Sequence, residues 1–400
     1  MPVDLSVNLK GIKFRNPFIV GSGPTVKNLD QIRAAADSLW AGASIKLAID
    51  PSPYLNLPPR YRWLTKERLH IFTAEKRLNA EQALSLMEES CKISDDFIAI
   101  PNLTYDGEDY EGWGKLAKRF TDAGARIIEL NMCCPNMSFN LSATGIQTKK
   151  NTGASLGNDL ENLSKAIRNV REAVSVPVIV KFFPSEDRIS QIARLALKAG
   201  ADAVGHAGNA LGIPDIDIRH PLQSIYRLQD QITLGCLSGP WIRPLALRAT
   251  YQIRTALGPE AFVIGAGGVS DLESAVQQMM AGSDMVWICT ETMLRGFDWL
   301  PKMLVGLENY MAEMNYKTIG DFRDLLIKNI VSAQDLTIRE GYAKVDAAKC
   351  IACGRCRKIG HCSAIGSDEG KAFIDTDKCL ACSTCVDVCP QRAISMGEKK

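Results

Sequence analysis

The residues with the clearest chemistry are eight cysteines near the end of the 400-residue chain, arranged in two runs. In each run three cysteines are separated by two residues, and a fourth follows after five residues in the first run and after three in the second. The eight are Cys350, Cys353, Cys356, Cys362, Cys379, Cys382, Cys385 and Cys389. Three closely spaced thiolates and a fourth from elsewhere are the ligands of a 4Fe–4S cube. The pattern therefore predicts two clusters and a role in electron transfer.

The fourth cysteine of each run binds the other cluster in two-cluster ferredoxins. We therefore expect one set of Cys350, Cys353, Cys356 and Cys389, and a second set of Cys379, Cys382, Cys385 and Cys362. The second run has the bacterial ferredoxin spacing, including Pro390, whereas the first run has two extra residues before Cys362. Two zinc knuckles are the alternative, but they need only Cys-x2-Cys pairs and leave ligands over. Since no cysteine is missing, we do not expect His361 to be a ligand.

Length and composition suggest one large and one small domain. A net charge of +2 is too small to indicate binding to nucleic acid or to an anionic membrane surface. No signal peptide is visible at the N-terminus, and no apolar stretch reaches the ~18 residues that span a membrane. The five cysteines outside the runs have no disulfide-like pattern, so we expect a reducing cytoplasm. They are Cys91, Cys133, Cys134, Cys236 and Cys289.

Eight apolar, strand-like segments alternate with helical stretches such as residues 160–173 and 189–199. The eight are residues 18–22, 43–48, 97–101, 126–131, 176–182, 201–206, 262–265 and 285–289. This alternation favours a closed parallel (β/α)8 TIM barrel, with an open doubly wound sheet as the alternative. We expect residues 5–17 to form a β-hairpin that caps the barrel. The predicted domains are a barrel over 1–312, a helical connector over 313–342 and a small α+β ferredoxin-like domain over 343–400.

Catalytic groups of such barrels lie at the C-terminal ends of the strands. Lys46 and Lys181 end apolar strands, where a lysine is costly to bury unless an anion or a flavin oxygen faces it. Glycine-rich turns at residues 238–239 and 265–268 can hold a phosphate, because bare backbone N–H groups can approach it. A plain tight turn is the alternative for both.

The segment Asn131-Met-Cys-Cys134-Pro-Asn136 follows the fourth predicted strand. It opens a polar loop of about twenty residues, and a long loop over a barrel mouth is usually a lid. A cysteine at the base of such a loop can act as a general acid or base. The alternative is that Cys133 and Cys134 only fill space in the core.

Together these segments resemble the dihydroorotate dehydrogenase and dihydropyrimidine dehydrogenase flavoproteins. A barrel followed by two ferredoxin clusters is similar to the C-terminal half of dihydropyrimidine dehydrogenase, and to the iron–sulfur subunit of its bacterial two-subunit form. The resemblance covers nearly the whole chain and is strongest in residues 131–136, 235–248 and 265–269 and in the eight cysteines. It implies FMN at the barrel mouth, with Lys46 near the flavin ring and Lys181 near its polar edge or ribityl chain. The residues implied at the phosphate are Ser238, Gly239, Gly267, Gly268 and Thr290.

The same resemblance assigns Cys134 as the active-site acid or base, and Asn131 and Asn209 as amides that hold a pyrimidine. Thr73 stands where the family has another substrate asparagine, and Asn136 stands where the pyrimidine enzyme has a histidine. Ala210 and Cys133 also differ from the threonine and serine that are usual at their positions. A site that lacks donors for a polar ring discriminates poorly or binds another compound.

We therefore expect a flavin-dependent reduction of an activated C=C bond, or the reverse oxidation, as in dihydropyrimidine dehydrogenase. Cys134 would move the proton, and Lys46 would stabilise negative charge on the flavin. Alternatives are the same scaffold acting on a non-pyrimidine activated alkene, dihydroorotate oxidation, an RNA dihydrouridine synthase, and a non-catalytic electron-transfer subunit. The expected electron partner is an NAD(P)-binding flavoprotein subunit or a free ferredoxin, within a homo- or hetero-oligomer.

Overall fold

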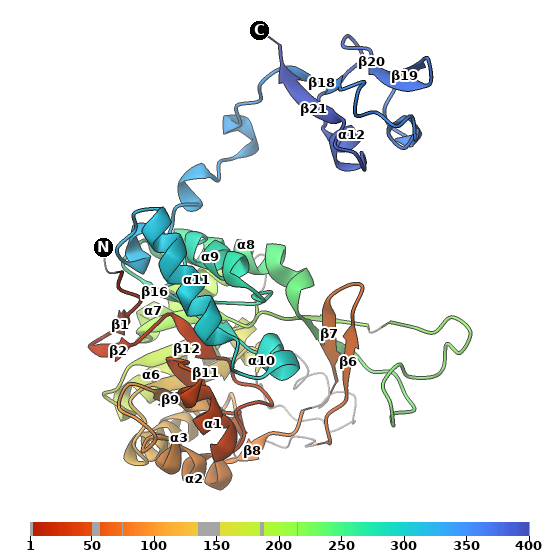
Figure 1. The fold of residues 1–400 in the computed structure, drawn as a ribbon. Helices are drawn as coiled ribbons and strands as arrows, with labels where there is room; N and C mark the ends of the chain where they lie inside the picture. The colour runs from red at the N-terminus through yellow and green to blue at the C-terminus, as the bar shows by residue number, and fades with distance from the viewer. Residues whose placement is uncertain are drawn as a thin grey trace. The chain divides into compact units, whose positions relative to one another are not determined.

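The computed structural model describes residues 3–49, 57–73, 75–134, 153–184, 188–213 and 215–399. Contacts between residues divide it into two compact units, Met1–Ile330 and Val331–Lys400 (Figure 1). No helix in these described ranges is long and apolar enough to cross a membrane.

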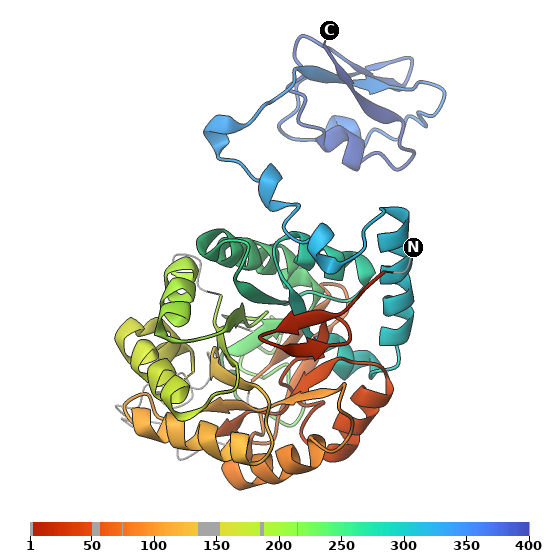
Figure 2. The same cartoon turned by 90° about the vertical axis from the view of Figure 1, so that its left-hand side faces the viewer.

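Unit 1 is a ring of parallel strands surrounded by helices (Figure 2). The strands are β3 (Phe18–Val20), β4 (Gly42–Ser44), β9 (Ile98–Ile100), β10 (Asn102–Thr104), β11 (Ile128–Met132), β12 (Val178–Phe182), β13 (Ala203–His206), β16 (Phe262–Ala266) and β17 (Met285–Ile288). Strand β9 pairs with β4 and β10 pairs with β11, while only Pro101 separates β9 from β10. One chain segment therefore joins the two ends of the sheet and closes the barrel.

The predicted (β/α)8 barrel is confirmed, and each of the eight predicted segments overlaps a barrel strand. The second segment is interrupted: β4 is followed by the short β5 (Ala48–Ile49), which pairs with β10 and with β8 (Leu78–Asn79). Lys46 lies in this interruption, so its side chain comes from an irregular segment of the barrel wall.

The barrel interior is filled by apolar side chains from the strands, including Ile19, Ile179 and Trp287. Leu9 and Phe14 join the same cluster from the hairpin of β1 (Val7–Leu9) and β2 (Ile12–Phe14), which is the predicted cap. Its two-residue turn has positive φ at Lys10 and at Gly11, as the tight turns that suit hairpins require. This packed interior confines the open space to the ends of the strands.

The helices cover the outer face of the sheet with apolar stripes at helical spacing. They are α1 (Leu29–Asp37), α2 (Ala80–Ser90), α3 (Tyr110–Asp122), α5 (Ala154–Asn158), α6 (Leu160–Ala173), α7 (Ile189–Ala199), α8 (Arg243–Leu257), α9 (Leu272–Met280) and α11 (Leu300–Glu313). The short α10 (Thr290–Arg295) instead contributes residues to the cavity described below. In α7, for example, Ile189, Ile192, Ala193 and Ala196 are buried, and the helix ends at Gly200 with φ +114°.

A second, antiparallel sheet adds to the barrel and was not predicted. It contains β14 (Ala210–Gly212), β15 (Gly235–Ser238), β7 (Leu69–Phe72) and β6 (Tyr61–Leu64), paired in that order. We call it the mouth sheet, because its strands contribute His70, Phe72, Cys236 and Ser238 to the cavity described below.

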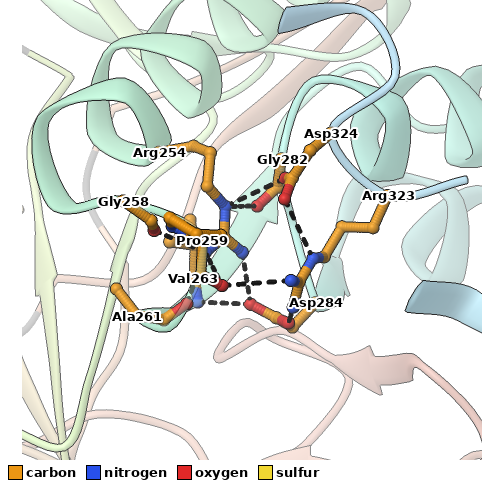
Figure 3. A network of polar contacts seen from close by, with 9 residues as sticks. All are labelled: Arg254, Gly258, Pro259, Ala261, Val263, Gly282, Asp284, Arg323 and Asp324. Carbon is orange, nitrogen blue, oxygen red and sulfur yellow. Dashed lines mark hydrogen bonds and ion pairs between the residues drawn. The ribbon is translucent and has the colours of Figure 1, made fainter. Parts of the chain in front are cut away.

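A network of buried charges ties the segment after α11 to unit 1 (Figure 3). Arg254 of α8 is 2% exposed and contacts Asp284 at 2.6 Å and Asp324 at 3.1 Å. The Arg254 guanidinium also donates to the carbonyls of Gly258, Pro259, Ala261 and Gly282. Arg323 forms a further ion pair with Asp284.

These contacts hold the first part of the segment predicted as a connector, residues 313–342, against the barrel. Residues up to Ile330 group with unit 1, because Phe322 is fully buried and Arg323 and Asp324 pair with the barrel. The helices inside the segment are short 3-10 turns, η2 (Ile319–Asp321), η3 (Ile327–Asn329) and η4 (Ala333–Asp335).

Unit 2 is small and holds the eight cysteines. It pairs β18 (Gly341–Val345) with β21 (Ile394–Glu398), and β19 (Ile365–Asp368) with β20 (Lys371–Ile374), and it contains η5 (Cys356–Lys358) and α12 (Thr384–Asp387). Its buried cluster consists of Ala343, Cys356, Cys385 and Ile394. Domains with so little core depend on staples such as metals or disulfides.

Candidate active site

The mouth sheet and the carboxyl ends of the barrel strands enclose a cavity of about 1060 Å³, counting the space open to solvent. Ten of the predicted site residues line it: Lys46, Asn131, Cys134, Lys181, Asn209, Ser238, Gly239, Gly267, Gly268 and Thr290. Thr73 is buried nearby and is not among the lining residues; its hydroxyl donates to the Oε1 atom of Gln229 at 3.3 Å. Asn136, and the loop expected to form a lid, lie outside the described residues.

Lys46 is 3% exposed and forms an ion pair with Glu75, whose other oxygen lies 3.5 Å from the Tyr61 hydroxyl. Burial, followed by the charge of Arg77, lowers the pKa of Lys46 to about 7. The carboxylate of Glu75 acts in the opposite direction and favours the ammonium form. The charged and neutral forms of Lys46 are therefore close in free energy near neutral pH.

Lys181 is also buried, and its Nζ atom lies 3.5 Å from Glu129 and 4.2 Å from the ring centre of Trp287. Burial opposes its charged form, but Glu129 and the nearby thiols outweigh burial and raise the pKa of Lys181. Glu129 is fully buried and accepts hydrogen bonds from Ser44 and Asn102. The raised pKa favours the charged form of Lys181, and Glu129 is the anion that faces it.

Asn131 is linked to the same buried network. Its amide nitrogen donates to Asn102 at 3.0 Å, and its oxygen accepts from the backbone N–H of Cys133 and lies 3.2 Å from the Cys133 sulfur. Of its two amide hydrogens, one is used by Asn102 and the other can face a ligand in the cavity.

Cys134 lies beside groups that favour its thiolate form. A hydrogen bond from Cys133 lowers the pKa of Cys134 most, and Arg77 and Lys46 lower it further against the effect of burial. The pKa of Cys133 is raised by the same contact and by burial, so Cys133 keeps its proton. The arrangement suits Cys134 to exchange a proton with a bound compound.

Three glycines with positive φ lie together at one end of the cavity: Gly239 at +101°, Gly267 at +98° and Gly268 at +75°. A Cβ atom on any of them would come within 2.7 Å of backbone atoms, so larger residues do not fit. Beside them Thr290 donates to Ser238 at 3.2 Å, and burial lowers the pKa of His70, a neighbour of Ser238, to about 4. Backbone N–H groups and hydroxyls are hydrogen-bond donors, which suit a phosphate better than a metal ion.

Asn209 gives an independent sign that the cavity takes a polar ligand. Its Oδ1 atom is buried and has no hydrogen-bond partner in the described part of the chain. An unpaired buried oxygen costs free energy, so a donor on a bound molecule would satisfy it.

The sequence did not reveal several residues of the site, including Glu75, Arg77, His70 and Glu129. Glu129 carries the signal that identified the lysines, a charge inside an apolar strand, and could have been found from it. Glu75 and Arg77 come directly after β7 of the mouth sheet. Because the sequence did not predict this sheet, it did not indicate that these two residues reach the cavity.

In unit 2 the eight cysteines border two separate hollows of about 420 and 450 Å³. Cys350, Cys353, Cys356 and Cys389 line one, and Cys362, Cys379, Cys382 and Cys385 line the other. This is the grouping predicted from the spacing. Among the described residues no three potential ligands meet closely enough for a single metal ion.

The two cysteine loops share a backbone conformation. Ala352 and Ala381 have φ of +57° and +55°, and the residues two positions later in each loop, Gly354 and Ser383, have +69° and +63°. Left-handed residues in short succession form concave nests of N–H groups, which bind anions and iron–sulfur clusters. Both hollows therefore fit a 4Fe–4S cube.

Comparison with known proteins agrees with this architecture. The family model for dihydroorotate dehydrogenase matches residues 4–311, and that for a 4Fe–4S binding domain matches residues 372–395. The NAD-dependent dihydropyrimidine dehydrogenase subunit PreA of Escherichia coli K12 is 28% identical over 361 residues, which cover 88% of this chain and 84% of that protein. Chloroplastic dihydropyrimidine dehydrogenase (NADP(+)) of Arabidopsis thaliana is 27% identical over 354 residues, 84% of this chain and 80% of that protein. The catalytic subunit of dihydroorotate dehydrogenase B (NAD(+)) of Thermococcus kodakarensis is 30% identical over 329 residues, 81% of this chain and 98% of that protein.

Proposed function

The chain belongs to the dihydroorotate dehydrogenase family of oxidoreductases, and on that premise we propose that it interconverts a pyrimidine and its dihydro form. The observation that carries the proposal is that one cavity brings together Cys134, two buried lysines, two amides and a glycine cradle. We expect the cofactor phosphate to bind at the glycines and the substrate to bind at the amides of Asn131 and Asn209.

FMN fits the cavity as the flavin. Ser238, Gly239, Gly267, Gly268 and Thr290 would hold its phosphate, and Lys46 and Lys181 would face the polar atoms of its ring. When bound, FMN supplies hydride transfer. The two cysteine sets of unit 2 would hold two 4Fe–4S clusters, which pass single electrons.

The protein groups then carry the proton and position the substrate. In oxidation the Cys134 thiolate removes a proton from a substrate carbon, and in reduction the thiol returns it. Asn131 offers an amide hydrogen to a substrate carbonyl, and the oxygen of Asn209 accepts from a ring N–H. Lys46 places positive charge where negative charge develops during the reaction.

One observation favours a second candidate, an activated alkene other than a pyrimidine. Thr73, at the position of a further substrate amide in the family, hydrogen-bonds Gln229 and is not among the residues that line the cavity. The pyrimidine edge would then have fewer polar partners, which weakens selection for that ring. Dihydroorotate, the substrate in the names of some relatives, is a third compound to test.

Electrons must enter or leave through another protein, because we find no nicotinamide-binding motif in the sequence. The similarity to proteins named as subunits supports an NAD(P)-binding flavoprotein partner, with a free ferredoxin as the alternative. The free thiols and the clusters also support a reducing cytoplasm as the location.

The test is anaerobic turnover with reduced methyl viologen as the electron donor and a panel of acceptors. Oxidation of the donor by uracil or thymine supports the pyrimidine proposal. Turnover only with orotate, cyclic enones or imides would show that the pocket has another substrate. A protein that purifies without flavin and reduces none of them would contradict the enzymatic proposal.

A further inference from the structure

We propose that the imidazole of His361 donates a hydrogen bond to the sulfur of Cys382, and that this bond raises the reduction potential of the cluster held by Cys362, Cys379, Cys382 and Cys385. The inference rests on the two-cluster part of the proposed function. It assigns a role to the extra residues of the first cysteine run, which the ligand set alone leaves unexplained.

The geometry comes from the longer spacing between Cys356 and Cys362. The intervening segment turns through a hydrogen bond from the Cys362 N–H to the Ile359 carbonyl at 3.2 Å. This turn brings the Nε2 atom of His361 to 3.4 Å from the Cys382 sulfur, which belongs to the other cysteine run. A distance of 3.4 Å is within the range of hydrogen bonds to sulfur.

The chemistry fixes which atom donates. A cysteine bound to iron is a thiolate and has no hydrogen, so the N–H of the imidazole must be the donor. One added electron increases the negative charge on the cluster and its sulfurs, and a donor stabilises that charge. Hydrogen bonds to the sulfurs are among the factors that set cluster potentials. The hydrogen bond should therefore raise the reduction potential of the cluster.

The other cluster lacks this contact. Cys353 occupies in the first run the place of Cys382 in the second, and it has no side-chain hydrogen bond in the described part of the chain. The residue before the crossing cysteine is His361 in one run and the apolar Val388 in the other. Backbone N–H groups serve both sets, from Ala343 to Cys379 and from Ala393 to Cys389. The imidazole is thus one difference between the two sites; the Thr384 hydroxyl, 3.6 Å from the Cys382 sulfur, is another, because Arg355 stands at that place in the first run.

The experiment is a redox titration of the full-length protein with dithionite under anaerobic conditions, followed by electron paramagnetic resonance. His361→Leu removes the donor, His361→Gln keeps an N–H donor, and Ser363→Ala changes a neighbouring exposed hydroxyl as the control. We expect two one-electron steps in the wild type, of which His361→Leu shifts one to lower potential. His361→Gln should shift it less, and Ser363→Ala should leave both steps in place.

Two results would overturn the proposal. Unchanged potentials in His361→Leu would show that the contact has no electronic effect, and loss of iron from one cluster would show that His361 is a ligand. Iron and sulfide analysis of the wild type comes first. A chain that binds fewer than two cubes would contradict the two-cluster part of the proposed function itself, separately from the role of His361.

Discussion

Cys134 is placed beside Cys133, Arg77 and Lys46, and each of these neighbours favours its thiolate form. The contacts support the proposal that a cysteine, whose ordinary pKa lies above neutral, acts as a base in this cavity. The sequence identified Cys134 and Lys46 but not Arg77, since the importance of Arg77 depends on where the chain folds after the mouth sheet. Residues at the ends of apolar strand-like segments could be singled out from the sequence, and their partners from loops could not.

The first prediction concerns the pH dependence that Arg77 imposes. Oxidation needs the thiolate of Cys134, which is present above its pKa, so the oxidative rate should fall as pH drops through that lowered pKa. Arg77→Met removes a positive charge, so it should raise the pKa of Cys134 and move the acidic limb of the pH–rate profile to higher pH. The pH profile of kcat/KM for the dihydro substrate measures the shift, and Lys76→Met is the matched control. An identical limb in Arg77→Met and wild type would exclude this role of Arg77.

At the level of elements, the alternation of apolar strands and helical stretches was sufficient to predict the barrel and its capping hairpin. Two features escaped the pattern because they are short or interrupted. The strands of the mouth sheet have three or four residues each, too few for a clear period. Pro101 divides one barrel strand into β9 and β10, and this break is visible only from the pairing of each half.

The second prediction tests the charge network that joins α8, β17 and the segment after α11. Arg254→Met removes the buried one of the two arginines that pair with Asp284, and breaking a buried ion pair costs about 3–5 kcal/mol of unfolding free energy. Arg323→Met is the control, because Arg323 is 24% exposed and its removal should cost less. Denaturant unfolding of unit 1, followed by tryptophan fluorescence, measures both. Equal losses in the two variants would contradict the role given to burial.

At the level of the whole molecule, the chain combines a barrel with a large apolar core and a cysteine-rich unit with a very small one. The sequence predicted both parts and their order. The contacts that hold residues 313–330 against the barrel, such as the pair of Arg254 and Asp324, were not predictable, because the residues that make them have no periodic pattern.

The third prediction follows from this imbalance. Removing iron with a chelator under oxidising conditions should unfold unit 2, since its core alone cannot offset the entropy of ordering the chain. Unit 1 should keep its melting transition and its flavin. Scanning calorimetry with and without chelator would show one transition lost and one retained. A chain that melts in the same way before and after iron removal would contradict the dependence of unit 2 on its clusters.

The most direct test of the account is a single turnover of photoreduced enzyme mixed anaerobically with uracil or thymine, observed through the flavin absorbance. Wild type should reoxidise rapidly, whereas Cys134→Ala should contain the same amount of flavin and reoxidise about 10²- to 10⁴-fold more slowly. Cys289→Ala, which changes another cysteine lining the cavity, is the control. Reoxidation of Cys134→Ala at the wild-type rate would contradict the assignment of Cys134 as the proton donor.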